Sequence, residues 1–403
     1  MVFKVLSNKL SIEEQFFKIP EYSLRHVGCW PEIVFNWKAV LWSLGHFLFL
    51  SFGAYGETVF GLVKIADLTL ALETFCPAIT KQVTVIKMLI FLFYRKDMKR
   101  LVLRLKELIT AQKADEERLQ IGQNLASTAG AYSMFLYYSA HSTMMFFFFK
   151  PIVINLYKMA VNEDTIRDLP FRMFLPKQFI ESQYYYIVFC LVGYSGWSTV
   201  YTFVGVDSFF VTFCLYMSAL FRFIQYDVEK ALSDLPQNDF QVLNYRQRQH
   251  YKKKLAKIIE NHNDVIHLSS DFSSLFAVIV LGHFLSAALI LCVSIMVLLL
   301  SVESLGFGAV LYTSYCICTM FQLFVYCYGG TEITENSLEI SKTVYQTDWY
   351  KCDVETQKML LLIMLRSQRA VTVKAPFFSP SLPAFQTIMS STGSYIALLK
   401  SFL

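Results

Sequence analysis

The sequence predicts an all-α membrane protein with seven transmembrane helices and a cytoplasmic N-terminus. Hydrophobic residues make up 55% of the 403 residues and charged residues only 17%, which is too apolar for an ordinary soluble protein. Seven apolar stretches are long enough to cross the roughly 30 Å apolar core of a bilayer at about 1.5 Å per residue. Basic residues gather in the segments on one side of these stretches.

The seven predicted spans follow one another with polar segments between them. In order they are Ile33–Tyr55, Ala66–Phe93, Ala131–Tyr157, Tyr184–Leu220, Phe272–Leu300, Gly306–Tyr328 and Ala384–Leu403. We divide the chain into residues 1–328 with the first six spans, a cytoplasmic helical region 329–376, and a terminal region 377–403 with the last span. The N-terminal segment lacks the pattern of a cleaved signal peptide, so we expect the first span to direct insertion.

Lysine and arginine predict the orientation. The N-terminal segment and the other segments on its side of the membrane carry 26 of these residues, and the opposite side carries six. Because positive charge favours the cytoplasm, the N-terminus is expected inside and the C-terminus outside. A G-protein-coupled receptor has the reverse orientation, which disfavours that class.

The last span carries a stripe of small hydroxylated side chains. Thr387, Ser391, Ser394, Leu398 and Ser401 recur at steps of four, three, four and three, which places them on one helix face. Lipid offers hydroxyl groups no partner, so this face is expected to meet protein or water. The candidate pore residues are Ser391, Ser394, Leu398 and Ser401, with Leu398 as a hydrophobic constriction. The stripe could equally serve close helix packing, and periodicity alone does not decide.

The second span contains several ionisable residues. Asp67, Glu73, Lys81 and Lys87 all lie within it, and ionisable groups inside a span usually face protein or water. Glu73 and Lys81 lie eight residues apart on roughly one helix face. They either pair with neighbouring side chains or mark an aqueous cavity, and as relay groups they would suit a transporter.

Aromatic and methionine side chains dominate the third and fourth spans. HSTMMFFFF occupies His141–Phe149, and Trp197 and Tyr201 follow in the fourth span. In the sixth span, Tyr312 and Tyr315 share one face. Such side chains suit a pocket for a small volatile molecule, although helix packing and interfacial belts also explain many of them. His141 is expected to be packed or hydrogen-bonded.

Two cytoplasmic segments are expected to be helical. Residues 221–265 are basic and amphipathic, and we expect a cytoplasmic extension of helix five, although the lysines could bind anionic lipid. Asp353–Ala370 is too short in its apolar part to span, so it suits a buried helix at a subunit contact, with Asp353 as its N-cap. Helix six is expected to continue past the membrane before it.

The sequence gives little support for catalysis or metal binding. It lacks a Walker loop, an HExxH motif and a dinucleotide fingerprint, and GYSGW at Gly193–Trp197 lacks the second glycine that a nucleophile elbow requires. Seven of the nine cysteines lie in apolar runs, which favours free thiols over a disulfide framework. We expect no catalytic residue, no metal site, no cofactor and no nucleic-acid partner.

Two stretches near the C-terminus match a known pattern. SYIALLKSF, Ser394–Phe402, is similar to the TYhhhhhQF signature that ends insect chemoreceptors, with serine in place of both the threonine and the glutamine. YCYGGTEITENSLEISKTVYQTDWY, Tyr326–Tyr350, resembles the insect odorant receptor pattern that leads into the last helix. The resemblance implies a ligand-gated cation channel with seven membrane helices, in the plasma membrane of olfactory sensory neurons.

The resemblance also implies a ligand site and partners. In that family odorants bind among helices two, three, four and six, which by depth and face implicates Phe75, Met145, Phe149, Trp197, Tyr201, Tyr312 and Tyr315. The family assembles as tetramers around the last helix. The short link between helices four and five indicates a ligand-tuned subunit that needs the odorant receptor co-receptor. The expected contacts are this co-receptor, an odorant, membrane lipid and permeating cations. A gustatory receptor and a transporter remain the alternatives.

Overall fold

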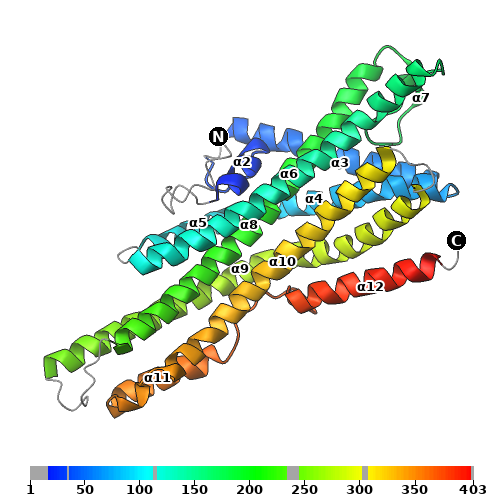
Figure 1. The fold of residues 1–403 in the computed structure, drawn as a ribbon. Coiled ribbons are helices and arrows are strands. Elements are labelled where there is room, and N and C mark those ends of the chain that lie inside the picture. Colours follow the sequence, from blue (N-terminus) through cyan, green and yellow to red (C-terminus); the bar gives the residue numbers. More distant parts are fainter. Residues whose placement is uncertain (1–16, 34–35, 112–115, 234–244, 302–306, 401–403) are drawn as a thin grey trace.

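The computed structural model describes the chain except for residues 1–16, 34–35, 112–115, 234–244, 302–306 and 401–403, and its described part is helical, with one isolated β-bridge between Ala375 and Phe378. The α-helices are α2 (Lys18–His26), α3 (Trp37–Val63), α4 (Leu68–Phe93), α5 (Arg95–Thr110), α6 (Glu116–Ala160), α7 (Lys177–Glu181), α8 (Tyr185–Ser233), α9 (Tyr245–Ser301), α10 (Phe307–Gln346), α11 (Val354–Ser367) and α12 (Leu382–Lys400). Figure 1 shows α6, α8 and α10 as long rods that run side by side, with α12 along the flank of the bundle.

The helical architecture predicted from hydrophobic patterning is confirmed. Each predicted span corresponds to one long helix, namely α3, α4, α6, α8, α9, α10 or α12 in turn. In the described part of the chain, α3, α4, α8, α9 and α10 are long and apolar enough to cross a membrane by length and composition alone. α6 and α12 fall outside this group of five.

Several helices extend well beyond the apolar part of their sequence. The predicted extensions of helices five and six are confirmed, because α9 already begins at Tyr245 and α10 continues to Gln346. The third and fourth predicted spans correspond to helices that are longer than the spans, since α6 begins at Glu116 and α8 continues to Ser233. Backbone hydrogen bonding is local, so a helix continues into water wherever one of its faces can pack, whereas a hydropathy pattern ends with the bilayer.

The first span begins later than predicted. α3 starts at Trp37, and Asn36 is its N-cap, with its side-chain oxygen accepting a hydrogen bond from the backbone N–H of Ala39 at 2.9 Å. The helix continues to Val63 rather than ending at Tyr55. A polar capping residue inside an apolar stretch therefore determined the boundary.

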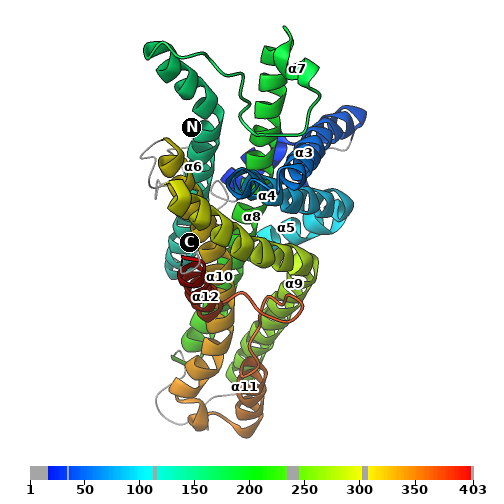
Figure 2. The ribbon, with the colours of Figure 1, turned by 90° about the vertical axis from the view of Figure 1, so that its right-hand side faces the viewer.

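Helix α8 is the centre of the bundle. It packs against α2, α3, α4, α6, α9 and α10, and Figures 1 and 2 show it running between them. Every residue from 202 to 220 is buried. Ring contacts fill this core, for example Phe213 with Phe272 and Phe210 with Tyr326, each with centroids 4.3 Å apart. The most apolar part of α8 therefore contacts protein over its whole circumference.

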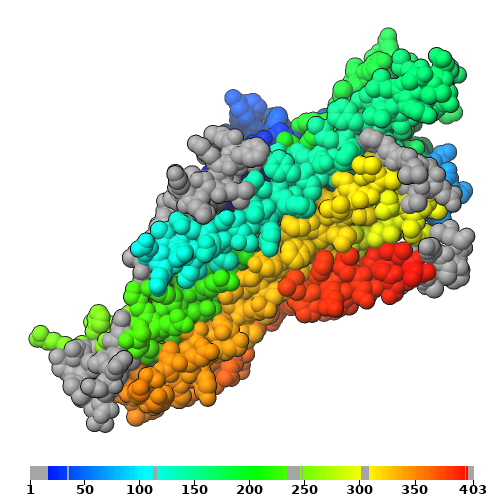
Figure 3. Space-filling view, in the orientation of Figure 1, coloured from blue at the N-terminus to red at the C-terminus, as the bar shows by residue number. Residues whose placement is uncertain are grey.

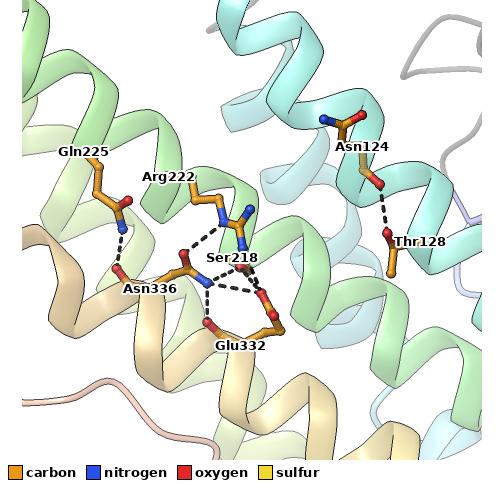
Figure 4. Close-up of polar contacts among 7 residues, drawn as sticks. All are labelled: Asn124, Thr128, Ser218, Arg222, Gln225, Glu332 and Asn336. Carbon is orange, nitrogen blue, oxygen red and sulfur yellow. Dashed lines mark hydrogen bonds and ion pairs between the residues drawn. The ribbon is translucent and has the colours of Figure 1, made fainter.

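A polar network joins the far ends of α8 and α10 (Figure 4). Arg222 Nε donates to the side-chain oxygen of Asn336 at 2.9 Å, and Gln225 donates to the Asn336 backbone carbonyl at 2.8 Å. Ser218 donates to the Glu332 carboxylate at 3.2 Å. These directional bonds tie the two helices together beyond the apolar core.

Helix α11 packs on α9 and α10, and one side of it is exposed. Leu360 and Ile363 are buried, whereas Leu361, Leu362 and Leu365 are exposed. The capping prediction was partly wrong. Asp353 occupies the N-cap position, but its carboxylate makes no bond to a backbone N–H and accepts from the Thr356 hydroxyl at 2.6 Å. A hydroxyl at the third helical residue competed with the backbone for the same carboxylate.

Helix α12 lies on the outside of the bundle, against α9 and α10 (Figure 3). Its first residue is held by α10, because the backbone N–H of Leu382 donates to the Thr331 hydroxyl at 2.9 Å. The Pro380 carbonyl passes so close to Gly330 of α10 that a Cβ at this position would overlap it. A glycine is therefore required where the chain crosses α10 before α12 begins.

Candidate functional site

A cavity lies among α4, α6, α8 and α10. Its volume is about 60 Å³, and most of its wall is apolar. The residues that the site depends on are Thr80 and Lys81 of α4, Thr143, Met144 and Phe147 of α6, Gly196, Thr199 and Val200 of α8, Tyr315, Thr319 and Gln322 of α10, and Phe171 of the segment between α6 and α7. A concave, mostly apolar space with a few polar groups is the usual form of a small-molecule site.

Gly196 keeps part of this space open. A Cβ at this position would lie 2.5 Å from a ring carbon of Phe171 and 2.6 Å from the Met144 methyl carbon. Both distances are too short for ordinary contact, so even an alanine would displace these side chains. The glycine in the GYSGW stretch therefore shapes the cavity and has no part in a nucleophile elbow.

The tyrosine hydroxyl in the wall is bonded to α4. Tyr315 donates to the Cys76 carbonyl at 3.0 Å and lies 2.5 Å from the Thr80 hydroxyl. Seven residues further along α10, the Gln322 amide donates to Asp207 of α8 at 2.9 Å. These bonds fix the position of α10 relative to α4 and α8 at the depth of the cavity.

Two of the predicted ligand residues lie in or beside this cavity. Tyr315 lines it. Tyr312 is buried one turn away along α10, beside Phe147 and Phe171, which line the cavity. Phe147 contacts both tyrosines, with ring centroids 6.5 and 6.0 Å away. The shared face predicted for the two tyrosines is confirmed.

Met145 and Phe149 do not line the cavity. Their side chains are 45% and 43% exposed, and α6 turns Met144 and Phe147 toward the cavity instead. One residue rotates a helix by about 100°, and the run HSTMMFFFF is apolar on every face, so the pattern could not show which side faces inward. Met145 and Phe149 are sequence neighbours of cavity-lining residues, and their role in ligand binding stays a prediction.

The remaining three predicted residues lie outside the cavity wall. Phe75 packs against Gly61 in the contact of α4 with α3. Trp197 and Tyr201 belong to an aromatic cluster around His141, whose ring centroid lies 5.5 and 5.0 Å from theirs. His141 is packed and hydrogen-bonded as expected, since its Nδ1 lies 2.7 Å from the Tyr137 carbonyl.

Sequence reasoning missed several residues that line the cavity. Phe171 comes from a connecting segment, where periodicity carries no information about contacts with helices. Thr80 and Gly196 were not selected because small residues carry little chemical signal by themselves. Gly196 was the available sign in the sequence, because a glycine among large side chains indicates that another segment packs closely there.

The structural pairing of the charged residues in the second span is confirmed. Lys81 forms an ion pair with Glu57 of α3, and Lys87 pairs with Asp207 at 2.5 Å. Glu73 lies 3.3 Å from Arg172 and 3.6 Å from Lys150.

Asp67 has a separate role. It is the N-cap of α4, and its carboxylate accepts from the backbone N–H of Leu70 at 3.1 Å. Asp67, Glu73 and Lys81 therefore have distinct structural partners, which argues against a continuous transporter relay. All nine cysteines are free, as the apolar surroundings of most of them predicted.

The hydroxylated stripe of α12 faces away from the rest of the chain. Thr387, Ser391 and Ser394 are exposed, whereas Thr392 is buried against the bundle. Leu398 lies in the last turn of α12, and Ser401 falls outside the described residues. Within the described part of one subunit, Thr387, Ser391 and Ser394 therefore lie away from the contact of α12 with α9 and α10.

The family that matches this chain is described as 7tm Odorant receptor, and the match covers residues 67–393. The chain belongs to the odorant receptor family. It is 37% identical over 403 residues to odorant receptor 22c of Drosophila melanogaster, covering 98% of this chain and 99% of the relative. It is 33% identical to odorant receptor 10a of the same species, covering 99% and 98%. Membership in this family favours an odorant receptor over the gustatory receptor and transporter alternatives.

Solved structures agree on the fold. The insect olfactory receptor OR5 from Machilis hrabei superposes with a TM-score of 0.74 at 13% identity, covering 94% of this chain and 96% of that receptor. Its complex with eugenol gives the same TM-score and identity over 96% of this chain and 98% of the other. The protein is thus a helical membrane receptor of the odorant receptor family and no enzyme.

Proposed function

We propose that this odorant receptor is the ligand-binding subunit of a ligand-gated, non-selective cation channel that it forms with the odorant receptor co-receptor. An odorant occupies the cavity among α4, α6, α8 and α10, and the channel opens along the exposed face of α12. The observation that carries the proposal is this pair of features in one subunit: a mostly apolar cavity among four helices, and a hydroxylated helix face that the subunit itself leaves uncovered.

The ligand site consists of the cavity residues, with Tyr315 and Tyr312 retained from the sequence prediction. Phe147, Met144 and Phe171 supply its aromatic and sulfur-containing wall. Phe75, Met145, Phe149, Trp197 and Tyr201 lie outside this wall and stay predictions as ligand-binding residues. The cavity, at about 60 Å³, is small compared with the 300–1,000 Å³ of typical ligand pockets, so an odorant must displace flexible side chains such as Met144 on entry.

Helix α10 supplies a route from the cavity to α12. It lines the cavity with Tyr315 and Thr319, and it contacts α12 through the rings of Phe324 and Phe385, whose centroids are 5.9 Å apart. An odorant that fits better when α10 is displaced shifts the population toward that arrangement. Because α12 is packed on α10, the displacement is passed to the pore.

The proposed pore residues are Ser391, Ser394, Leu398 and Ser401, with Leu398 at the constriction. In a tetramer, the exposed faces of α12 from the four subunits would surround a common axis and present hydroxyl groups to hydrated cations. The exposed leucines of α11 would form contacts between subunits. We propose that the N-terminus lies in the cytoplasm and that the channel lies in the plasma membrane of olfactory sensory neurons.

Electrophysiology tests the proposal. Cells that express the chain together with the odorant receptor co-receptor should show odorant-evoked cation currents across a chemically diverse panel, and cells with the chain alone should show none. Leu398→Ala should raise the baseline conductance or change gating. Thr392→Ala, on the buried side of the same helix, is the matched control. Saturable ligand flux without channel currents, or an unaltered Leu398→Ala channel, would contradict the proposal.

A further inference from the structure

A lysine ammonium group forms part of the cavity wall. Lys81 lines the cavity with its side chain 2% exposed, and its Nζ donates to Oε1 of the fully buried Glu57. The same Nζ lies 3.9 Å from the ring centroid of Phe171, which also lines the cavity. The cavity thus has a cation at its surface, with its neutralising carboxylate behind it on α3.

Two further polar atoms beside this ion pair lack a hydrogen-bond partner among the described residues. They are Oε2 of Glu57 and Oγ of Ser195, both in residues that are 0% exposed. Ser195 Oγ and Lys81 Nζ both lie close to Gly53, where a side chain of any size would intrude between them. Buried polar atoms are nearly always hydrogen-bonded, so this cluster has hydrogen-bonding capacity that the protein itself does not use.

The hydroxyl groups in the wall are already committed, and the Gln322 amide donates one of its N–H groups to Asp207. The hydroxyl groups of Thr143, Thr199 and Thr319 each donate to the backbone carbonyl four residues earlier, at 2.9, 2.8 and 3.0 Å. The hydroxyl group of Tyr315 donates to Cys76. An ammonium group has three N–H donors, and Glu57 accepts one of them. Lys81 is therefore the strongest donor that the wall can offer to a bound molecule.

We propose that Lys81 makes this cavity selective for small neutral molecules that carry a hydrogen-bond acceptor oxygen, such as ketones, over hydrocarbons of the same shape. A carbonyl oxygen accepts from the ammonium group while the rest of the molecule contacts the apolar wall. A hydrocarbon leaves the donors without a partner and loses affinity. Because Glu57 already neutralises the ammonium charge, a neutral acceptor is favoured over a carboxylate. The inference rests on the cavity assigned under the proposed function.

Matched ligands separate shape from hydrogen bonding. Cyclohexanone and methylenecyclohexane form one pair, and 2-heptanone and 2-methyl-1-heptene form the second; in each pair a C=CH₂ group replaces the C=O group. The full-length receptor, purified in detergent micelles, is titrated with each compound, and thermal stabilisation gives its dissociation constant. We expect each ketone to bind about 10-fold or more tightly than its alkene, as expected for a buried donor left unpaired. Equal binding within both pairs, or no binding of the ketones, overturns the inference.

Substitutions test whether Lys81 causes the preference for ketones. The double variant Glu57→Leu/Lys81→Met replaces the pair by apolar side chains and should bring the ketone-to-alkene ratio close to one. Gln82→Met, an exposed neighbour on the same helix, is the control and should keep the wild-type ratio. A double variant that keeps the wild-type ratio overturns the inference.

Two further results distinguish a failure of the inference from a variant that does not fold and from a failure of the proposed channel function. If the double variant does not fold, the exchange Glu57→Lys/Lys81→Glu retains an ion pair but puts a carboxylate at the cavity wall, and it too should lose the preference for ketones. A retained preference overturns the inference. If the wild-type chain shows ketone selectivity in binding but no odorant evokes a current with the co-receptor, the proposed channel function fails and the selectivity stands.

Discussion

The ion pair between Lys87 and Asp207 gives the sharpest stability prediction. Asp207 of α8 is fully buried and accepts from Lys87 at 2.5 Å, from the Tyr326 hydroxyl at 2.7 Å and from the Gln322 amide at 2.9 Å. One carboxylate therefore joins α8 to α4 and α10 beside the cavity. The two neutral donors bind different carboxylate oxygens, so Asp207→Asn keeps an acceptor for only one of them and also removes the counter-charge of Lys87.

The loss of stability expected for Asp207→Asn follows from the burial of Lys87. Its side chain is 2% exposed, so the substitution leaves an ammonium charge without its partner inside the bundle. Breaking a buried ion pair in this way costs about 3–5 kcal/mol. The double variant Lys87→Met/Asp207→Asn removes the charge as well and should lose less than about 2 kcal/mol, because Met approximates the volume of Lys and Asn retains an acceptor. The second substitution should therefore rescue the first.

Thermal unfolding of the purified variants in detergent micelles measures this cycle, and surface expression in cells provides an independent readout. Asp207→Asn should lower the melting temperature by several degrees, and the double variant should recover most of the loss. Asp271→Asn, at an exposed position of α9, is the control and should melt like wild type. A stable Asp207→Asn protein, or a double variant no more stable than the single one, would refute the reasoning.

Three other predictions test the cavity, the approach to α12 and the surroundings of His262 on α9. Gly196→Ala should weaken the binding of larger odorants by about 10-fold while sparing the smallest, measured by current dose–response, because the added methyl group overlaps the cavity wall. Gly330→Ala should impair channel opening or assembly because its Cβ overlaps the Pro380 carbonyl, whereas Gly308→Ala, with open space around it, should behave as wild type. Burial, together with a nearby arginine, lowers the pKa of His262 from 6.5 to about 4. The unfolded chain therefore binds this proton first, so stability should fall as the pH drops from about 6.5 toward 4, and His262→Gln should flatten this melting-temperature profile.

The sequence was sufficient for features that depend on local pattern. The seven helices that correspond to the predicted spans, the continuations of helices five and six beyond their apolar parts, and the shared face of Tyr312 and Tyr315 all follow from apolar length and helical period. The hydroxylated stripe of α12 was equally visible, and it does face away from the subunit over Thr387–Ser394. These features depend on which residues are neighbours along one helix, and a sequence contains that information directly.

Only the tertiary structure decided which side chains meet. The inward face of α6 depends on how the helix is rotated against α8 and α10, and an all-apolar stretch gives no preference for one rotation. The partner of Lys81 is Glu57 on another helix, and Phe171 reaches the cavity from a connecting segment. Such contacts join residues distant in sequence, and they depend on the packing of whole helices, to which every residue in the bundle contributes.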